Sequence, residues 1–195
     1  MKITPLLMGI SAAALLGAFA VSPASAEQTK TKTVSFRGMS IVVPAGWKVR
    51  RSDTDAVGKD WLQIWTTSCH SKPSCPSFDI VGPKVIRGGD AMESYKTDHP
   101  FAPGTGVSGC RFRSDTKFGE RYPSTKPAVN GHRDLGSGHK AQYREWAAEC
   151  YDFNTNKAGK RFTQREWYLP KAGILVADGW NTPGLAKILE QATWS

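Results

Sequence analysis

The sequence lacks the short motifs that carry most hydrolytic and phosphate-transfer chemistry. No Gly-x-Ser-x-Gly turn occurs, since the glycines around Ser108 and Ser137 have the wrong spacing, and this excludes the usual serine-hydrolase elbow. No two histidines lie one helical turn apart with a glutamate between them, so the zinc-peptidase helix is also excluded. The glycines at residues 104–106 are not followed by the lysine and hydroxyl residue of a phosphate-binding loop.

Acidic residues are scarce: 17 Asp and Glu stand against 26 Lys and Arg, so the net charge is +9 at pH 7. The positive charges are spread along the chain without long basic runs. One interpretation is attraction to an anionic cell surface such as wall polymer or phospholipid. The other is that the charge only keeps a secreted protein soluble. We expect an unidentified protein or an anionic surface polymer as the partner, and no nucleic acid.

Long apolar runs are absent after the first 26 residues, and those 26 have the pattern of a secretory signal peptide. Lys2 precedes an apolar run over residues 6–21, and residues 24–26 (Ala-Ser-Ala) form a small-x-small cleavage site. A membrane anchor is the alternative, but the run contains two glycines and a serine and is shorter than the roughly 20 residues that span a bilayer. The first cysteine is Cys69, which excludes a lipid-modified N-terminus.

Cleavage after Ala26 would leave a secreted chain that begins near Glu27. Its net charge would be one less than +9, since Lys2 is the one charged residue of the leader. Residues 27–195 are long enough for a core that folds unaided, so one domain is expected. We expect no transmembrane segment in this mature chain.

Only four cysteines are present, and outside the cytoplasm four cysteines normally form two disulfide bonds, with three pairings open. We expect Cys69 to pair with Cys75 and Cys110 to pair with Cys150. A metal site at Cys69, Cys75 and His70 would need a fourth ligand and a reducing compartment. A redox pair usually has two residues between its cysteines, whereas five lie between Cys69 and Cys75. We expect neither a metal nor a cofactor.

Apolar and polar residues alternate in the first part of the mature chain, which predicts strands. The expected strands are residues 34–36, 39–43, a third from Trp47, 60–67 and 78–82. Residues 88–100 have a different pattern, with Asp90 able to cap, Glu93 three residues later and a His-Pro pair at the end. A short helix is predicted there.

Residues 101–138 are rich in glycine, proline, serine and charged residues. We expect long exposed loops there, with one strand over residues 107–113. Residues 140–153 and 160–169 flank a turn-rich connection and should form an antiparallel hairpin.

The last part of the chain predicts a strand over residues 173–180, followed by a helix that residues 181–184 open. With the preceding elements, this order predicts an α+β fold. We expect a mostly antiparallel β-sheet with a short middle helix and a C-terminal helix packed on it.

Residues 43–47 (Val-Pro-Ala-Gly-Trp) form an aliphatic-Pro-x-Gly-Trp turn after the leading strand pair. A middle helix, a long hairpin and a last helix after a strand follow. In this order the elements resemble the fold shared by PsbP-like photosynthetic extrinsic proteins and Mog-like Ran-binding proteins. The resemblance covers most of the mature chain, with the two disulfide bonds and the loop-rich middle as departures. It implies a binding or scaffolding module without catalytic activity.

Each strand of the predicted hairpin carries the triplet Arg-Glu-Trp, at residues 144–146 and 165–167. One interpretation is a binding face, in which indole rings stack on a ligand and an arginine orients an anionic group. The residues of this candidate face are Trp61, Trp65, Arg144, Trp146, Arg165 and Trp167. The alternative is core packing and a cross-strand ladder on an ordinary sheet.

A secreted hydrolase with an unrecognised site is the second hypothesis. His132, Asp134 and His139 lie within one glycine-rich stretch, and a loop can gather such side chains in space. Three glutamates of the hairpin could also supply paired catalytic carboxylates, although the neighbouring arginines would lower their pKa values and oppose a general acid. These are Glu145, Glu149 and Glu166. We expect a secreted, non-catalytic binding or interaction protein rather than an enzyme.

Overall fold

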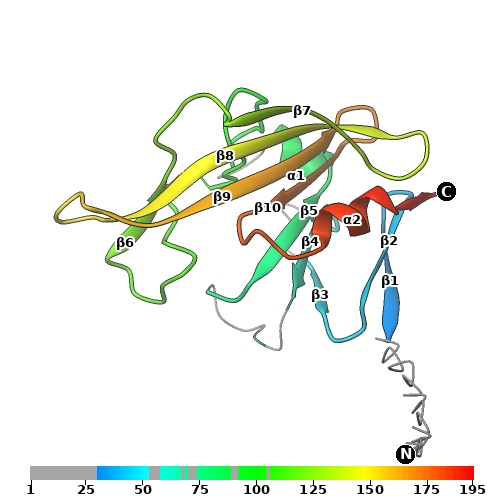
Figure 1. Ribbon diagram of the computed structural model, residues 1–195, viewed down its shortest axis with the longest axis horizontal. Coiled ribbons are helices and arrows are strands. Elements are labelled where there is room, and N and C mark those ends of the chain that lie inside the picture. Colours follow the sequence, from blue (N-terminus) through cyan, green and yellow to red (C-terminus); the bar gives the residue numbers. More distant parts are fainter. Residues whose placement is uncertain (1–29, 53–57, 67–68, 70–73, 89–91, 105) are drawn as a thin grey trace, which may run out of the picture.

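The computed structural model describes residues 30–52, 58–66, 69, 74–88, 92–104 and 106–195 (Figure 1). Two predictions fall outside these residues, the signal peptide and Asp90 as a helix cap, as does His70, which the sequence analysis set aside as a metal ligand. Within them, no helix is both long and apolar enough to cross a lipid bilayer.

The described residues form two antiparallel β-sheets (Figure 1). The larger sheet has the strand order β3-β4-β5-β10-β9-β8-β6, and β7 also pairs with β8. Its strands are β3 (Lys48–Arg51), β4 (Trp61–Trp65), β5 (Ser77–Val81), β6 (Phe118–Arg121), β7 (Val129–Asp134), β8 (Lys140–Asp152), β9 (Ala158–Leu169) and β10 (Ile174–Asp178). The smaller sheet has the order β1-β2-β11, from β1 (Thr31–Phe36), β2 (Met39–Pro44) and β11 (Thr193–Trp194).

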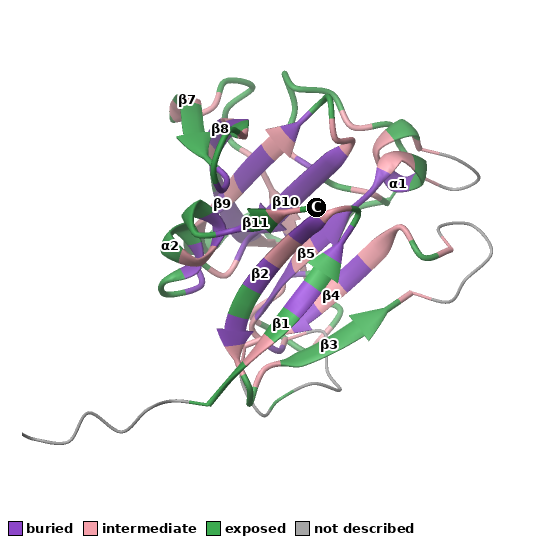
Figure 2. Ribbon diagram, turned by 90° about the vertical axis from the view of Figure 1, so that its right-hand side faces the viewer, coloured by how far each residue is buried: buried purple, intermediate pink, exposed green. Residues whose placement is uncertain are grey.

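One face of the larger sheet is apolar and forms the main core. Figure 2 shows that buried residues are concentrated in the central strands. Alternate residues of these strands are buried in the core, among them Ile64, Phe78, Trp167 and Val176. The smaller sheet and α2 (Leu185–Glu190) cover this face with buried side chains from β1, β2 and α2. The period-two pattern of the sequence therefore has its physical cause in this core.

The opposite face of the larger sheet carries polar side chains in its middle. Across the strand register, Gln63 of β4 lies opposite Asp79 of β5, followed in turn by Ala177 of β10, Glu166 of β9 and Arg144 of β8. We call these five residues the polar row. Because side chains alternate between the two faces of a strand, the whole row points away from the main core.

The chain between β5 and β6 crosses this polar face. It begins with α1 (Pro83–Arg87), and we call its described residues from 92 to 117 the roof. Val85 and Phe101 join it to the sheet in a second hydrophobic cluster. Phe101 packs edge to face on Trp61 of β4, with 6.5 Å between the ring centroids, and Tyr95 packs in the same way on Tyr168 of β9, with 5.2 Å. The roof is therefore anchored on the sheet by aromatic packing.

The helix predicted over residues 88–100 is wrong in position. The middle helix is α1, which ends before Gly88, and residues 93–96 have no regular structure. Gly88 has a φ of 72°, and a Cβ there would lie 2.7 Å from a backbone nitrogen six residues later, so the chain folds back tightly. Tyr95 then donates a hydrogen bond to Glu166, a tertiary contact that the local pattern does not encode.

The loops predicted over residues 101–138 contain two strands, β6 and β7, which pair with different parts of β8. The strand predicted over residues 107–113 is wrong, since the described residues there form one isolated bridge, between Gly109 and Gly119. The cause is β8, whose 13 residues present a long edge of backbone donors and acceptors. Hydrogen bonding to this edge holds two polar segments, β6 and β7, as strands where their composition predicts loops.

The β8–β9 hairpin and β10 are confirmed, as is a mostly antiparallel fold with short helices. α2 begins at Leu185 after Gly184, and β11, which was not predicted, pairs with β2. Both disulfide bonds are confirmed. Their Cα atoms lie 5.4 Å apart in Cys69–Cys75 and 5.3 Å apart in Cys110–Cys150, so these thiols do not serve as metal ligands.

Candidate functional site

A pocket of about 610 Å³ lies between the polar row and the roof. We call it the central pocket. The sheet contributes Gln63, Ser77, Asp79, Gln164 and Ala177, and the opposite walls include Arg111, Glu120, Tyr122, Gly179 and Trp180. Its volume falls within the roughly 300 to 1,000 Å³ of small-molecule sites.

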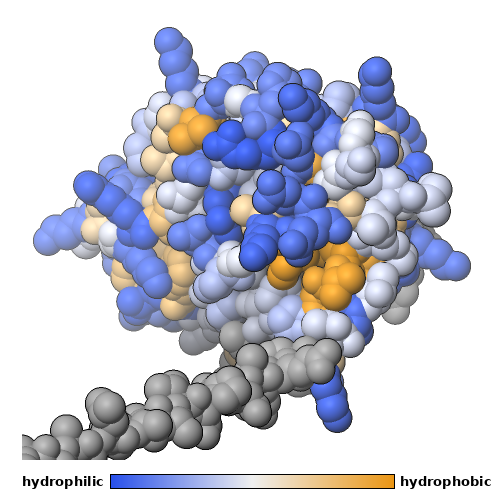
Figure 3. Space-filling view, turned by 45° about the vertical axis from the view of Figure 1, so that its right-hand side comes forward, coloured by the Kyte–Doolittle hydropathy of each residue, from blue (hydrophilic) through white to orange (hydrophobic). Residues whose placement is uncertain are grey.

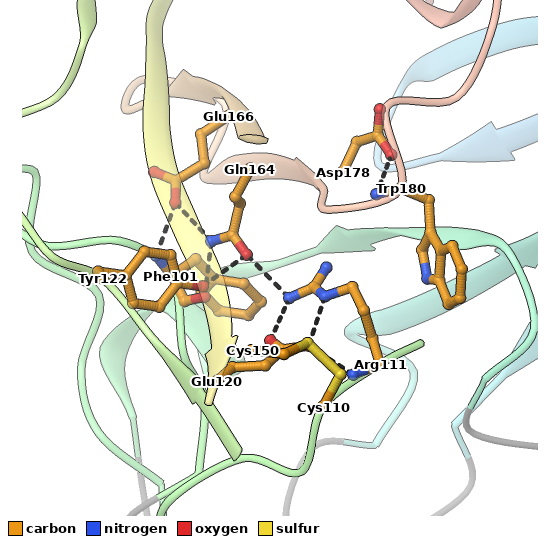
Figure 4. Close-up of polar contacts among 10 residues, drawn as sticks. All are labelled: Phe101, Cys110, Arg111, Glu120, Tyr122, Cys150, Gln164, Glu166, Asp178 and Trp180. Atoms are coloured by element: carbon orange, nitrogen blue, oxygen red, sulfur yellow. Dashed lines mark hydrogen bonds and ion pairs between the residues drawn. A yellow bond between two sulfur atoms is a disulfide. The ribbon is translucent and has the colours of Figure 1, made fainter. Parts of the chain in front are cut away.

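Arg111 is clamped in this pocket (Figure 4). Its Nε and Nη2 donate to the two carboxylate oxygens of Glu120 at 2.8 and 2.7 Å, and its backbone nitrogen donates to the same carboxylate at 2.7 Å. Nη2 also donates to Gln164 Oε1 at 3.3 Å. Such a bidentate pair fixes the plane of the guanidinium. Its third nitrogen, Nη1, makes no hydrogen bond to any described residue.

The surroundings of Arg111 fix its position further. Cys110, the preceding residue, is bonded to Cys150 of β8. The guanidinium carbon lies 4.7 Å from the centroid of the Phe162 ring. A Cβ on Gly179 would lie 1.3 Å from Nη1, so any other residue at position 179 would displace the guanidinium.

Asp79 has fewer partners. Its Oδ1 accepts a hydrogen bond from Trp61 Nε1 at 2.8 Å, and it forms no ion pair with a described residue. The pKa of Asp79 is raised to about 6, mainly by burial and to a smaller extent by the charge of Asp178. The hydrogen bond from Trp61 and the charge of Arg111 oppose this rise but do not cancel it.

Two neutral polar side chains beside Asp79 also lack partners. Gln63 lies opposite Asp79 in the register of β4 and β5, and Ser77 lies two residues before it on the same face. Neither side chain makes a hydrogen bond to another described residue. With Asp79 and Arg111 Nη1 they form a set of donors and acceptors that a ligand in the pocket can use.

A hydrogen-bond network joins the roof to the sheet beside the pocket (Figure 4). Glu166 accepts from the backbone nitrogen of Phe101 at 2.6 Å and from the Tyr95 hydroxyl at 2.9 Å. Gln164 Nε2 donates to the Phe101 carbonyl at 2.8 Å and to Glu166 at 2.9 Å, and Tyr122 donates to Gln164 Oε1 at 2.9 Å. Burial raises the pKa of Glu166 and of Tyr122, although the donors to Glu166 oppose its shift. The roof is thus held in one position over the pocket.

The structure does not bring the six predicted binding residues together. Trp146 and Trp167 are each 1% exposed and lie on opposite faces of the sheet, Trp167 in the main core and Trp146 on the side of the polar row. Arg165 pairs with the buried Asp178. Arg144 lies opposite Glu166 in the strand register, as the alternative of a cross-strand ladder describes.

Trp61 and Trp65 share the polar face of β4 and are half-buried. Through its hydrogen bond to Asp79, Trp61 is the residue of the predicted face that supports the central pocket.

His132 and Asp134 line a second pocket of about 430 Å³, beside Lys140 and Glu190. His139 is not among its lining residues. Its ring stacks on Trp194, with 3.9 Å between the centroids, and the ring nitrogen Nδ1 contacts the Ser137 carbonyl at 3.0 Å. The three residues of the hydrolase hypothesis are therefore not gathered in one pocket.

The three hairpin glutamates also have partners. Glu145 accepts from the Tyr143 hydroxyl, and Glu149 pairs with Arg121 at 2.8 Å. Glu166 belongs to the network beneath the roof. Among the described residues no cluster of histidine, cysteine, aspartate and glutamate has the arrangement of a metal site.

Sequence reasoning missed Gln63, Asp79, Arg111 and Glu120. A usable signal was present for the first two, because both are polar residues within strands that are otherwise rich in apolar residues. Arg111 follows a disulfide cysteine directly, but nothing in the local sequence pairs it with Glu120.

No family model and no curated protein matches the chain. Among solved structures, the solution structure of cyanobacterial PsbP (CyanoP) from Synechocystis sp. PCC 6803 is similar over 89% of this chain and 98% of that chain, with 11% sequence identity and a TM-score of 0.40. The resemblance expected from the sequence is confirmed as a weak likeness in fold.

Proposed function

We propose that the protein is an exported, non-catalytic binding protein that holds a small polar ligand in the central pocket. The observation that carries this proposal is a set of polar groups in one pocket that can still bind a ligand. Arg111 is held by Glu120, and its Nη1 has no partner among the described residues. The side chains of Gln63, Ser77 and Asp79 line the same pocket and can also form hydrogen bonds to a ligand. Fixed donors and acceptors lose little freedom on binding and therefore favour recognition.

Binding is favoured over catalysis by the state of the pocket's other charged groups. Both carboxylate oxygens of Glu120 accept hydrogen bonds from Arg111, which keeps this carboxylate occupied. Burial raises the pKa of Tyr122, so its hydroxyl stays protonated and continues to donate to Gln164. These groups hold the pocket in shape rather than react.

Export is supported by the leader pattern of the first 26 residues and by the two disulfide bonds, which fit an extracellular or lumenal location. The excess positive charge would bring the exported protein to an anionic surface polymer. The face seen in Figure 3 is mainly hydrophilic, with apolar patches between the hydrophilic side chains.

The test is ligand capture from the medium into which the protein is secreted. We expect at least one low-molecular-mass fraction to raise the Tm of the wild-type protein, because a ligand that binds only the native state stabilises it. The double variant Gln63→Met/Ser77→Ala should not respond, while Gln191→Met, an exposed change outside the pocket, should respond like wild type. An equal response from the double variant would place binding elsewhere, and no response from wild type would contradict the proposal.

The same experiment separates binding from hydrolysis. We expect mass spectrometry to recover the captured ligand unchanged after prolonged incubation. Steady conversion to a product that His132→Ala abolishes would instead support the hydrolase hypothesis.

A further inference from the structure

The central pocket has the opposite charge balance to the whole molecule. Among its lining residues, three are acidic (Asp79, Glu93 and Glu120) and two are basic (Arg111 and Arg121), in a chain whose net charge is +9. Both arginines are committed to carboxylates, Arg111 to Glu120 and Arg121 to Glu149 of β8. The pocket therefore offers more negative than positive charge to a ligand.

Asp79 is the acidic residue of the pocket floor without a cationic partner among the described residues. From β4 it is faced by Trp61 and Gln63, neither of which carries a charge, and from β10 by Ala177. The charges that act on it are Arg111, which belongs to the pair with Glu120, and Asp178, which is repulsive. A half-buried carboxylate of this kind is stabilised by a cation placed next to it.

We propose that the central pocket binds a ligand that carries a primary ammonium group, held by Asp79, close to an oxygen acceptor, held by Arg111 Nη1. The proposal rests on the proposed function and names its ligand class. Amino sugars and free amino acids or peptide amino termini share this chemistry, since each places an ammonium beside a hydroxyl, carbonyl or carboxylate oxygen.

Other ligand classes fit the pocket less well. A simple anion would bind weakly, because Asp79 and Glu93 repel it and the charge of Arg111 is already balanced by Glu120. A neutral sugar would form hydrogen bonds but leave the charge of Asp79 without compensation. An ammonium with an adjacent oxygen uses both unpaired groups at once.

The charge of Asp79 makes the binding depend on pH. Because its pKa is about 6, the carboxylate is mostly ionised at pH 7.5 and mostly protonated at pH 5. An ammonium ligand should therefore bind more weakly as the pH falls. Glu93 and Glu120 are the other acidic groups of the pocket, and no histidine lines it among the described residues.

The test uses two probes, glucosamine and glycylglycine, with N-acetylglucosamine and N-acetylglycylglycine as controls that lack the ammonium group, in isothermal titration calorimetry. We expect at least one amine to bind wild type with a Kd of about 1 mM or tighter at neutral pH, and its N-acetyl form to bind at least about tenfold more weakly. The probe that binds distinguishes a sugar amine from an amino-acid amine. The affinity for the ammonium form of the probe should fall about tenfold between pH 7.5 and pH 5, as the ionised fraction of Asp79 falls.

Two variants complete the test. Asp79→Asn keeps the shape and the hydrogen bond from Trp61 but removes the charge, and it should weaken the amine at least about tenfold while abolishing the pH dependence. Asp115→Asn, an exposed carboxylate of the roof outside the pocket, should change neither. Equal binding of amine and N-acetyl forms, equal binding by Asp79→Asn, or no binding of either amine would overturn the proposal. Capture of a ligand from the secreted medium that depends on Gln63 and Ser77 would still support the proposed function in each of these cases.

Discussion

At the scale of single residues, the two opposite charges of the central pocket differ in the number of hydrogen bonds that hold them. Arg111 has four hydrogen bonds that fix it, whereas Asp79 has one. Asp79 is half-buried, and removing a carboxylate even partly from water with so little compensation lowers the stability of the fold. Proteins keep such residues where function needs them, so Asp79 marks the site more clearly than its paired neighbours.

The first prediction is that Asp79→Asn stabilises the protein at pH 7. The pKa of Asp79 rises from 3.8 to about 6 on folding, so the native state binds the proton more tightly than the unfolded chain. Stability is then lost as the pH rises from about 4 to about 6, and the loss persists at pH 7; the difference in pKa corresponds to at most about 3 kcal/mol. Urea unfolding at several pH values should show the variant more stable at pH 7 and equal to wild type below pH 4. A variant that is less stable at pH 7 would contradict this assignment.

The second prediction concerns the glycine behind Arg111. Gly179→Ala places a methyl group where the guanidinium lies, so Arg111 must leave Glu120. We expect a loss of about 2 to 4 kcal/mol in the free energy of unfolding, from overpacking and a broken, largely buried ion pair. Gly104→Ala is the matched control, since it also lines the pocket but its Cβ would meet nothing within 4 Å. Equal effects of the two variants in chemical unfolding would show that Arg111 is not held as described.

At the scale of elements, the sequence predicts those parts of the fold whose pattern is local. The β8–β9 hairpin was predictable because two long, regular strands flank a turn-rich connection, and β1 and β2 because Val34, Phe36, Met39 and Ile41 alternate. The helix near residues 88–100 was not, since Tyr95 satisfies Glu166, 71 residues away in sequence. β6 and β7 were not predicted, because they form strands through their pairing with β8 and not through their own composition.

The site follows the same division. Gln63 and Asp79 could have been placed on one sheet face from strand alternation, but their position opposite each other depends on the register of β4 and β5. Arg111 reaches Glu120 because the segment between β5 and β6 crosses the sheet, and the sequence of that segment has no periodic pattern. Contacts between residues that lie far apart in the sequence cannot be recognised from the local sequence pattern.

The third prediction tests the element that carries the clamp. The Cys110–Cys150 bond closes a much longer loop than Cys69–Cys75, with a sequence separation of 40 against 6. Chain-entropy estimates give about 4 kcal/mol for the longer loop and about 2 kcal/mol for the shorter. Cys110→Ser/Cys150→Ser should therefore lower stability more than Cys69→Ser/Cys75→Ser in thermal unfolding. It should also abolish ligand binding, because Arg111 follows Cys110; a larger loss from the shorter loop would contradict this account.

At the scale of the whole molecule, a basic surface encloses an acidic pocket. β3 lies at one edge of the larger sheet and exposes Lys48, Arg50 and Arg51. Charged side chains at an edge prevent pairing with other sheets and also add to the positive field of the molecule. Surface charge and pocket charge would then serve different partners, an anionic polymer outside and an ammonium group inside.

The fourth prediction separates these two partners. We expect sedimentation with phosphatidylglycerol vesicles to weaken steeply between low and physiological salt, since the screening length falls to about 8 Å. Lys48→Glu/Arg50→Glu should weaken it further, while Asp79→Asn should leave it unchanged. Undetectable binding at low salt would mean that the charge serves only solubility.

The most direct test of the central claim is the titration of the Asp79 carboxyl carbon by NMR, without and with saturating glucosamine or glycylglycine. A midpoint near pH 6 is expected in the free protein, because the half-buried carboxylate has no cationic partner among the described residues. A fall of at least about one pH unit is expected when the ammonium binds, since a neighbouring positive charge favours the ionised form. A midpoint near 3.8 in the free protein, or one that saturation does not move, would contradict this claim.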